Sequence, residues 1–249
     1  MTGPTPAMPQ KSPDPFLNAT AAMDAGVNPY VGLLREATAS GALPLAFGPT
    51  LQSLSGRWRE HIAAYHGLAT PPKRLVVEIG CYKGHTLLEL SKAWPDTAFI
   101  GIDITFKRVV TTAQRLSAHG IKNAYCAMAN AIAIDQLFAP GELDGCLIFF
   151  PDPWIRKAKQ AKHRLVGPIF CQRLHSRLAP GGFCWLKTDH LPYFERANGA
   201  LAEAAFAPLP ATAPELLGAD FSSVFEQRFH AQKLPTYGSK WLKQQINCQ

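Results

Sequence analysis

Between residues 74 and 205 the chain alternates short apolar segments with longer amphipathic ones, and this alternation restricts the possible folds more than any other feature. The apolar segments, expected to be strands, span 74–79, 98–103, 123–128, 144–150 and 183–188. The expected helices span 84–93, 106–118, 167–178 and 192–205. Strands that alternate with helices favour a mostly parallel sheet with helices on both faces. The strands are almost continuously apolar, which is typical of strands buried on both sides.

Less regular sequence flanks this alternating region. Residues 1–28 are rich in proline, which breaks regular elements, so we expect a flexible leader there. An amphipathic helix is expected over 51–65, and a hairpin of 222–230 with 235–242 is expected at one edge of the sheet. There is no internal repeat and no convincing linker, so residues 29–249 are expected to form a single domain.

The composition favours a cytoplasmic globular protein. Of 249 residues, 47% are apolar and 17% are charged, which is ordinary for a domain with a hydrophobic core. No segment approaches the roughly 18 apolar residues of a membrane span, and residues 1–14 lack the apolar core of a signal peptide. The six cysteines form no Cys-x-x-Cys pair and are expected to be buried thiols. The histidines lack the spacing of metal ligands, and the net charge of +7 is compatible with a polyanionic partner.

The most distinctive local pattern is the segment 149–154, which reads Phe-Phe-Pro-Asp-Pro-Trp. An apolar strand ends here in a carboxylate, Asp152, that lies between two prolines and is followed by Trp154. A dense basic segment over 156–164 comes next. An acid, a flat ring and several cations at the end of a strand suit a nucleobase and its phosphates. The alternative is a proline-rich turn followed by solvated charges.

A second candidate site follows the first expected strand. Gly80 and Gly84 let the backbone approach a ligand at the carboxyl end of a parallel sheet, although a bare turn between strand and helix has the same residues. The spacing does not match the Gly-x-Gly-x-x-Gly of dinucleotide sites. Asp103 ends the second strand, where a carboxylate can accept both hydroxyls of a ribose. Glu78, at the end of the first, can hold a cationic group. Together these carboxylates fit S-adenosylmethionine, which has a ribose, a sulfonium and an amino group.

In the order of these motifs the chain resembles the tRNA (guanine-N7-)-methyltransferase family, of the bacterial single-chain type. The similarity runs from about residue 75 to residue 242. Its most specific marker is the segment 149–154 with the basic residues after it. The supporting markers are the segments 78–80, 99–103, 180–182, 188–189 and 223–226.

The resemblance implies a Rossmann-like class I methyltransferase fold with a seven-stranded, mostly parallel sheet. It implies transfer of a methyl group from S-adenosylmethionine to N7 of a guanine in tRNA, by a monomer or a homodimer. Asp152 matches the residue usually assigned the catalytic role. With the residue pattern, the resemblance indicates cofactor binding by Glu78, Gly80, Gly84, Asp103, Asn130 and Asp152. Substrate binding is expected of Arg156, Lys157, Lys162, Arg164, Asp189, Ser223, Phe225 and Glu226.

Two departures from the family pattern motivate other hypotheses. The family usually has glycine where this chain has Tyr82, and aspartate where it has Asn130. A catalytically impaired RNA-binding relative is therefore an alternative, as is a methyltransferase that acts on another RNA base. Individual site residues also have simpler interpretations. The pair 188–189 can cap a helix, and Glu226 can pair with a nearby cation such as Arg228.

Overall fold

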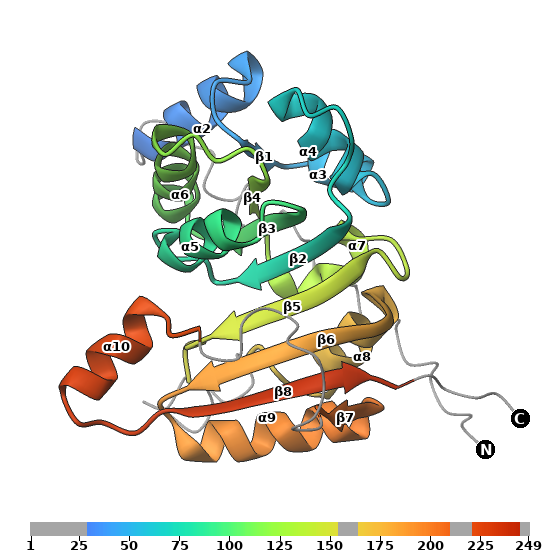
Figure 1. Ribbon diagram of the computed structural model, residues 1–249, viewed down its shortest axis with the longest axis vertical. Helices are drawn as coiled ribbons and strands as arrows, with labels where there is room; N and C mark the ends of the chain where they lie inside the picture. The colour runs from blue at the N-terminus through green and yellow to red at the C-terminus, as the bar shows by residue number, and fades with distance from the viewer. Residues whose placement is uncertain (1–28, 154–163, 210–220, 245–249) are drawn as a thin grey trace, which may run out of the picture.

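The computed structural model describes residues 29–153, 164–209 and 221–244 (Figure 1). Within these ranges eight strands form one sheet, in the order β1-β4-β3-β2-β5-β6-β8-β7. Strands β1 to β6 pair in parallel, and β8 runs antiparallel to both β6 and β7. The strands are β1 (Leu45–Phe47), β2 (Arg74–Ile79), β3 (Thr97–Asp103), β4 (Ala124–Met128), β5 (Leu143–Phe149), β6 (Leu178–Thr188), β7 (Phe206–Pro208) and β8 (Tyr237–Lys243).

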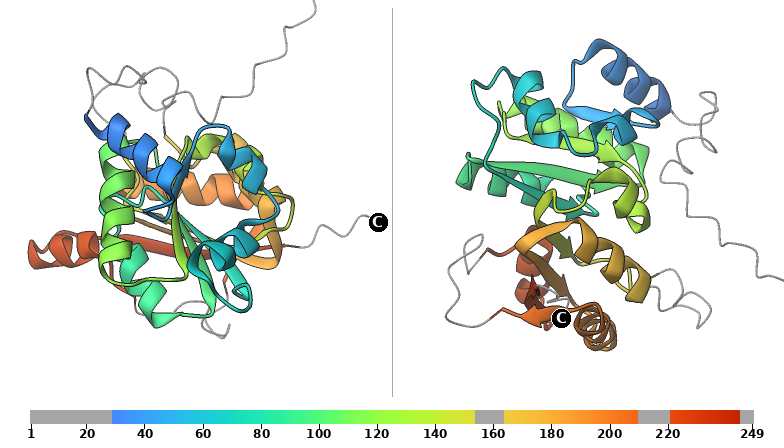
Figure 2. Two further views of the ribbon diagram at one scale, coloured as in Figure 1. Left: turned by 90° about the horizontal axis from the view of Figure 1, so that it is seen from above. Right: turned by 90° about the vertical axis from the view of Figure 1, so that its right-hand side faces the viewer.

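Helices cover both faces of this sheet, as the two turned views show (Figure 2). The helices are α2 (Pro29–Ser40), α3 (Thr50–Leu54), α4 (Trp58–His66), α5 (His85–Ala93), α6 (Phe106–Ala118), α7 (Ile134–Leu137), α8 (Pro168–Arg177), α9 (Leu191–Glu203) and α10 (Val224–Ala231), with a 3₁₀ turn η1 (Ala131–Ala133). Helices α5 and α6 pack near β3, whereas α9 packs on β6, β7 and β8. The arrowheads of β2, β5 and β6 point to one edge of the sheet, where α10 lies (Figure 1).

The hydrophobic core explains why the central strands form. In β2 the side chains of Leu75, Val76 and Val77 are at most 1% exposed, so both faces of the strand are covered. Helix α6 buries Val109, Ala113 and several neighbours on one face, and leaves its charged residues outside. Burial of apolar surface on both faces stabilises these strands, and their parallel pairing places their carboxyl ends at a common edge.

The structure confirms the mostly parallel α/β sheet with an antiparallel C-terminal edge, and corrects several details. Residues 224–231 form helix α10 and not the expected strand, so the antiparallel edge consists of β8 between β6 and β7. The expected helix over 51–65 is divided into α3 and α4 around Gly56, whose φ of 79° is left-handed. Strand β1 makes the sheet eight-stranded instead of seven-stranded. The expected leader, residues 1–28, lies outside the described residues.

Five cysteines fall in the described part of the chain, and all five are unpaired and buried, as expected: Cys81, Cys126, Cys146, Cys171 and Cys184. Among the described helices, none is long and apolar enough to cross a membrane. The described residues contain no cluster of three or more His, Cys, Asp or Glu side chains that could hold a metal ion.

Candidate active site

A cavity of about 360 Å³ lies at the carboxyl ends of the parallel strands. Its walls come from the residues that end β2 and β3, from the turn after β4, and from the segment before α8. In an open parallel sheet this edge is where ligands bind. The lining residues are Ile79, Gly80, Ile102, Asp103, Ile104, Arg108, Ala129, Asn130, Ala131, Ile132, Arg164 and Leu165.

Asp103 supplies this cavity with a buried carboxylate. The side chain ends β3 and the residue is 4% exposed. One oxygen, Oδ1, accepts a hydrogen bond of 2.9 Å from the backbone N–H of Thr105, and Oδ2 lies 3.6 Å from the guanidinium of Arg108. Oδ2 has no hydrogen-bond partner among the described residues. Because buried polar atoms are normally hydrogen-bonded, this oxygen is suited to accept a ligand hydroxyl.

Glu78 is the penultimate residue of the neighbouring strand β2 and is also 4% exposed. Desolvation raises the pKa of Glu78 to about 8, a hydrogen bond with Thr86 opposes this rise, and the charge of Asp103 adds to it. Oε2 of Glu78 has no hydrogen-bond partner within the described residues. Glu78 lines a narrow hollow of about 30 Å³ between the turn after β2 and the start of α10. A buried carboxylate with an unsatisfied oxygen is suited to a cationic group.

The turn between β2 and α5 has left-handed backbone conformations at three positions. Gly80 and Gly84 have φ values of 78° and 72°, and Tyr82 has a φ of 50°. A Cβ atom on Gly84 would lie 2.5 Å from Cγ2 of Thr112, so this glycine also permits close packing on α6. Left-handed φ favours glycine, so the structure gives a physical reason why Tyr82 is an unusual residue here.

The Tyr82 ring lies between α6 and α10. It meets the ring of Phe225 edge to face at 5.3 Å, and the guanidinium of Arg108 lies 5.2 Å from its centroid. Phe225 and Tyr82 both line the narrow hollow beside Glu78. These two rings therefore limit the space next to the buried carboxylate.

The loop that carries Asp152 begins where β5 ends. Phe150 has a φ of 52°, and its N–H donates to the carbonyl of Lys187 at 2.8 Å. Asp152 is exposed, and the carbonyl of Pro153 accepts a hydrogen bond of 2.8 Å from Nε of Arg164. Desolvation raises the pKa of Tyr193 to about 12, and the charge of Asp152 contributes to the rise. Asp152 thus lies between two backbone groups that are held by hydrogen bonds, the N–H of Phe150 and the carbonyl of Pro153.

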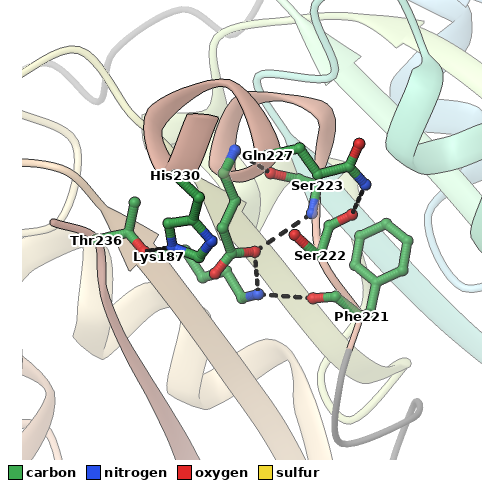
Figure 3. A network of polar contacts seen from close by, with 8 residues as sticks. Lys187, Phe221, Ser222, Ser223, Gln227, His230 and Thr236 are labelled. Carbon is green, nitrogen blue, oxygen red and sulfur yellow. Dashed lines mark hydrogen bonds and ion pairs between the residues drawn. The ribbon is translucent and has the colours of Figure 1, made fainter. Parts of the chain in front are cut away.

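A buried lysine holds the segment before α10 against the sheet (Figure 3). Nζ of Lys187 donates to the carbonyl of Phe221 at 2.6 Å and to Oε2 of Glu226 at 2.5 Å. Ser223 caps the helix: its hydroxyl accepts from the N–H of Glu226 at 3.2 Å, and Oε2 of Glu226 accepts from the N–H of Ser223 at 3.3 Å. The expected contact residues Ser223 and Glu226 therefore hold one another and Lys187.

Aromatic contacts add to this attachment of α10. Helix α10 has no fully buried residue, but Phe229 stacks on Phe150 with ring centroids 5.3 Å apart. Phe225, also on α10, lies 6.1 Å from Phe150. The position of α10 over the end of β5 thus depends on Lys187 and on a few rings.

The remaining predicted site residues lie at different places. Asn130 lines the larger cavity, and its Oδ1 accepts from the N–H of Ile132 at 3.1 Å. Asp189 is exposed after β6, and His190 instead caps α9 by accepting from the N–H of Tyr193 at 3.1 Å. The expected residues Trp154, Arg156, Lys157 and Lys162 lie outside the described residues.

Sequence reasoning missed Lys187 and Arg108. Lys187 is 8% exposed, and its position as the one charged residue of the apolar segment 183–188 was a signal that it needed a partner. Arg108 follows Asp103 by five residues, but no sequence pattern indicated that it would reach both Asp103 and Tyr82.

Residues 72–238 match a protein-family model described as "Putative methyltransferase". The tRNA (guanine-N(7)-)-methyltransferase of Cutibacterium acnes is 34% identical over 182 residues, which cover 72% of this chain and 60% of that protein. The protein of the same name from Chromohalobacter salexigens is 32% identical over 181 residues, covering 72% of each chain. The one from Nitrosococcus oceani is 35% identical over 131 residues, covering 52% of this chain and 55% of that protein. The chain thus spans 55% to 60% of two of these relatives.

Solved structures show the same fold at low sequence identity. The aminoglycoside resistance methyltransferase NpmB1 aligns with a TM-score of 0.54 and 16% identity, over 76% of this chain and 93% of that one. The 16S rRNA (adenine(1408)-N(1))-methyltransferase from Catenulisporales acidiphilia aligns with a TM-score of 0.52 and 15% identity, over 77% of this chain and 93% of that one. These likenesses confirm the Rossmann-like methyltransferase fold.

Proposed function

We propose that this chain, which belongs to the tRNA (guanine-N(7)-)-methyltransferase family, transfers a methyl group from S-adenosylmethionine to N7 of a guanine in tRNA in the cytoplasm. The observation that carries the proposal is the arrangement at the carboxyl edge of the sheet. Two buried carboxylates, on Glu78 and Asp103, have unsatisfied oxygens at the ends of adjacent strands. The Asp152 loop leaves the sheet from β5, the strand on the other side of β2.

The residues present fit S-adenosylmethionine. Oδ2 of Asp103 would accept from the ribose hydroxyls, and Oε2 of Glu78 would accept from the amino group of the methionine part. Asn130, in the same cavity as Asp103, has the donor and the acceptor that an adenine edge requires. A volume of about 360 Å³ lies within the range of small-molecule sites, roughly 300–1,000 Å³.

The chemistry at guanine N7 requires little proton transfer, because N7 has a free lone pair. Bound S-adenosylmethionine supplies an electrophilic methyl group on a sulfonium. The protein then has to align N7 with that methyl group and stabilise the positive charge that develops on the base. Asp152 would do both, by accepting hydrogen bonds from the guanine edge. Pro151 and Pro153 restrict the backbone around the carboxylate, and Arg164 holds the carbonyl of Pro153.

The test is methyl transfer from labelled S-adenosylmethionine to bulk tRNA by the wild type and by Asp152→Asn. The variant keeps the size of the side chain and removes its charge, so we expect a rate loss of about 100-fold or more. Asp96→Asn is the matched control, because Asp96 is an exposed carboxylate near the amino end of β3. Activity of Asp152→Asn close to that of the control would refute the catalytic role.

One observation favours a second candidate function, an RNA-binding relative without catalysis. Tyr82 and Phe225 reduce the hollow beside Glu78 to about 30 Å³. Isothermal titration with S-adenosylmethionine separates the two functions. Micromolar binding supports the enzyme, whereas tRNA binding with no measurable cofactor heat supports the RNA-binding relative.

A further inference from the structure

A second hollow, of about 180 Å³, adjoins the larger cavity. The two share the side chains of Ile132, Arg164 and Leu165, so they form one continuous depression. The second hollow extends toward the start of α8 and the exposed side of α9. Its lining residues are Ile132, Arg164, Leu165, Val166, Gly167, Pro168, Ile169, Phe170 and Arg196.

The chemistry of this hollow is cationic and apolar. Two guanidinium groups line it, on Arg164 and Arg196, and none of its lining residues is acidic. Ile169 is 60% exposed, an unusual exposure for a large aliphatic side chain. The N-cap of α8, Gly167, has no side chain to cap the helix, and Pro168 at the first helical position has no N–H, so the N–H groups that follow Pro168 add positive potential. A ligand that combines negative charge with an apolar face fits these walls.

The second hollow is linked to the proposed catalytic loop. Nε of Arg164 donates to the carbonyl of Pro153, the residue after Asp152, and its guanidinium lies 5.8 Å from the centroid of the Tyr193 ring. Arg196 follows Tyr193 by three residues on α9, so the two residues lie on the same side of that helix. An RNA strand that presents a base to Asp152 would therefore pass over Arg164 and toward Arg196.

We propose that this hollow binds a nucleotide of the substrate RNA next to the target guanosine. Its phosphate lies against Arg164 and Arg196, and its base or sugar covers Ile169. The inference rests on the proposed function for the identity of the RNA. Charge complementarity supports this inference, since the protein has a net charge of +7 and the charged residues that line the hollow are all cationic.

The test compares Arg196→Glu with Lys73→Glu, which changes the charge by the same amount at the opposite edge of the sheet. Lys73 immediately precedes β2, its side chain is 84% exposed, and its ion pair with Asp96 is an exposed one. Arg196 is exposed as well, so neither change disturbs the core. The assay is fluorescence anisotropy of labelled tRNA over a series of salt concentrations, with cofactor affinity measured by isothermal titration.

Arg196→Glu should weaken tRNA binding by about tenfold, and Lys73→Glu by less than about twofold. Arg196→Ala should reduce the slope of log affinity against log salt by about one. Equal effects of the two Glu variants would overturn the proposal, as would unchanged binding by Arg196→Glu or no tRNA binding by the wild type.

Activity distinguishes this proposal from the proposed function. If tRNA binding depends on Arg196 but no methyl is transferred, the nucleotide site stands and the proposed function fails. If methyl transfer to tRNA is normal and Arg196→Glu leaves its KM unchanged, the proposed function stands and the nucleotide site fails.

Discussion

The raised pKa of Glu78 predicts that cofactor binding releases a proton. Desolvation raises this pKa to about 8, so most of the carboxyl groups are protonated at pH 7. An amino group or a sulfonium bound beside Glu78 favours the ionised form. Ionising a group one pH unit below its pKa costs about 1.4 kcal/mol, which lowers cofactor affinity about tenfold at pH 7. Affinity should therefore rise nearly tenfold between pH 6 and pH 7 and level off above pH 8.

Isothermal titration measures both the affinity and the proton. At pH 7, buffers with different ionisation enthalpies should report release of about 0.9 proton per cofactor bound. Glu78→Gln should bind more weakly above pH 8, with no proton release. His85→Gln is the control, because His85 lines the same hollow as Glu78. Desolvation and nearby cations lower the pKa of His85, so this variant should retain the pH dependence of cofactor affinity. Affinity that is constant from pH 6 to pH 8 would refute the reasoning.

The carboxyl group of Glu78 also affects the stability of the protein without cofactor. The pKa of Glu78 in the folded protein lies above its ordinary value of 4.5, so the folded protein binds this proton more tightly than the unfolded chain does. The stability that it contributes is fully present below about pH 4.5 and is lost as the pH rises through about 8. Glu78→Gln should remove this dependence.

Three further predictions concern the packing around the site. Lys187→Met should lower the free energy of unfolding by about 3 kcal/mol, because the substitution leaves the partly buried carboxylate of Glu226 without its cation. Urea unfolding measures this free energy, and a loss below about 0.5 kcal/mol would contradict the prediction. Gly84→Ala should cost about 2 kcal/mol or more, since the added Cβ meets Thr112 at a left-handed φ, and a thermal melt equal to that of the wild type would contradict the clash. Tyr82→Gly should relieve the left-handed strain and tighten cofactor binding, and weaker binding by titration would show that the ring is a cofactor contact.

Sequence reasoning located the carboxylates because they end strands. Glu78 is the penultimate residue of the apolar strand β2, Asp103 is the last residue of β3, and parallel strands end at one edge of the sheet. Because β2 and β3 are adjacent and parallel, the two side chains lie at the same edge. The unsatisfied oxygens and the pKa of Glu78 could not be predicted, because they depend on which atoms surround each carboxylate.

The C-terminal segment shows where local pattern was misread. Residues 222–230 were expected to be a strand, although Ser223 followed three residues later by Glu226 is the pattern of a helix-capping box. The partner of Glu226 is Lys187, 39 residues earlier in the sequence. Such a contact is set by how α10 docks on the sheet, and a single sequence does not encode it in a local pattern.

Methylation of guanine N7 in tRNA is the activity that we propose for this chain. The most direct measurement is mass spectrometry of nucleosides from tRNA incubated with the purified protein and isotopically labelled S-adenosylmethionine. We expect labelled 7-methylguanosine with the wild type and a loss of that product with Asp152→Asn. A label on any other nucleoside, or an unlabelled tRNA despite measurable cofactor binding, would contradict it.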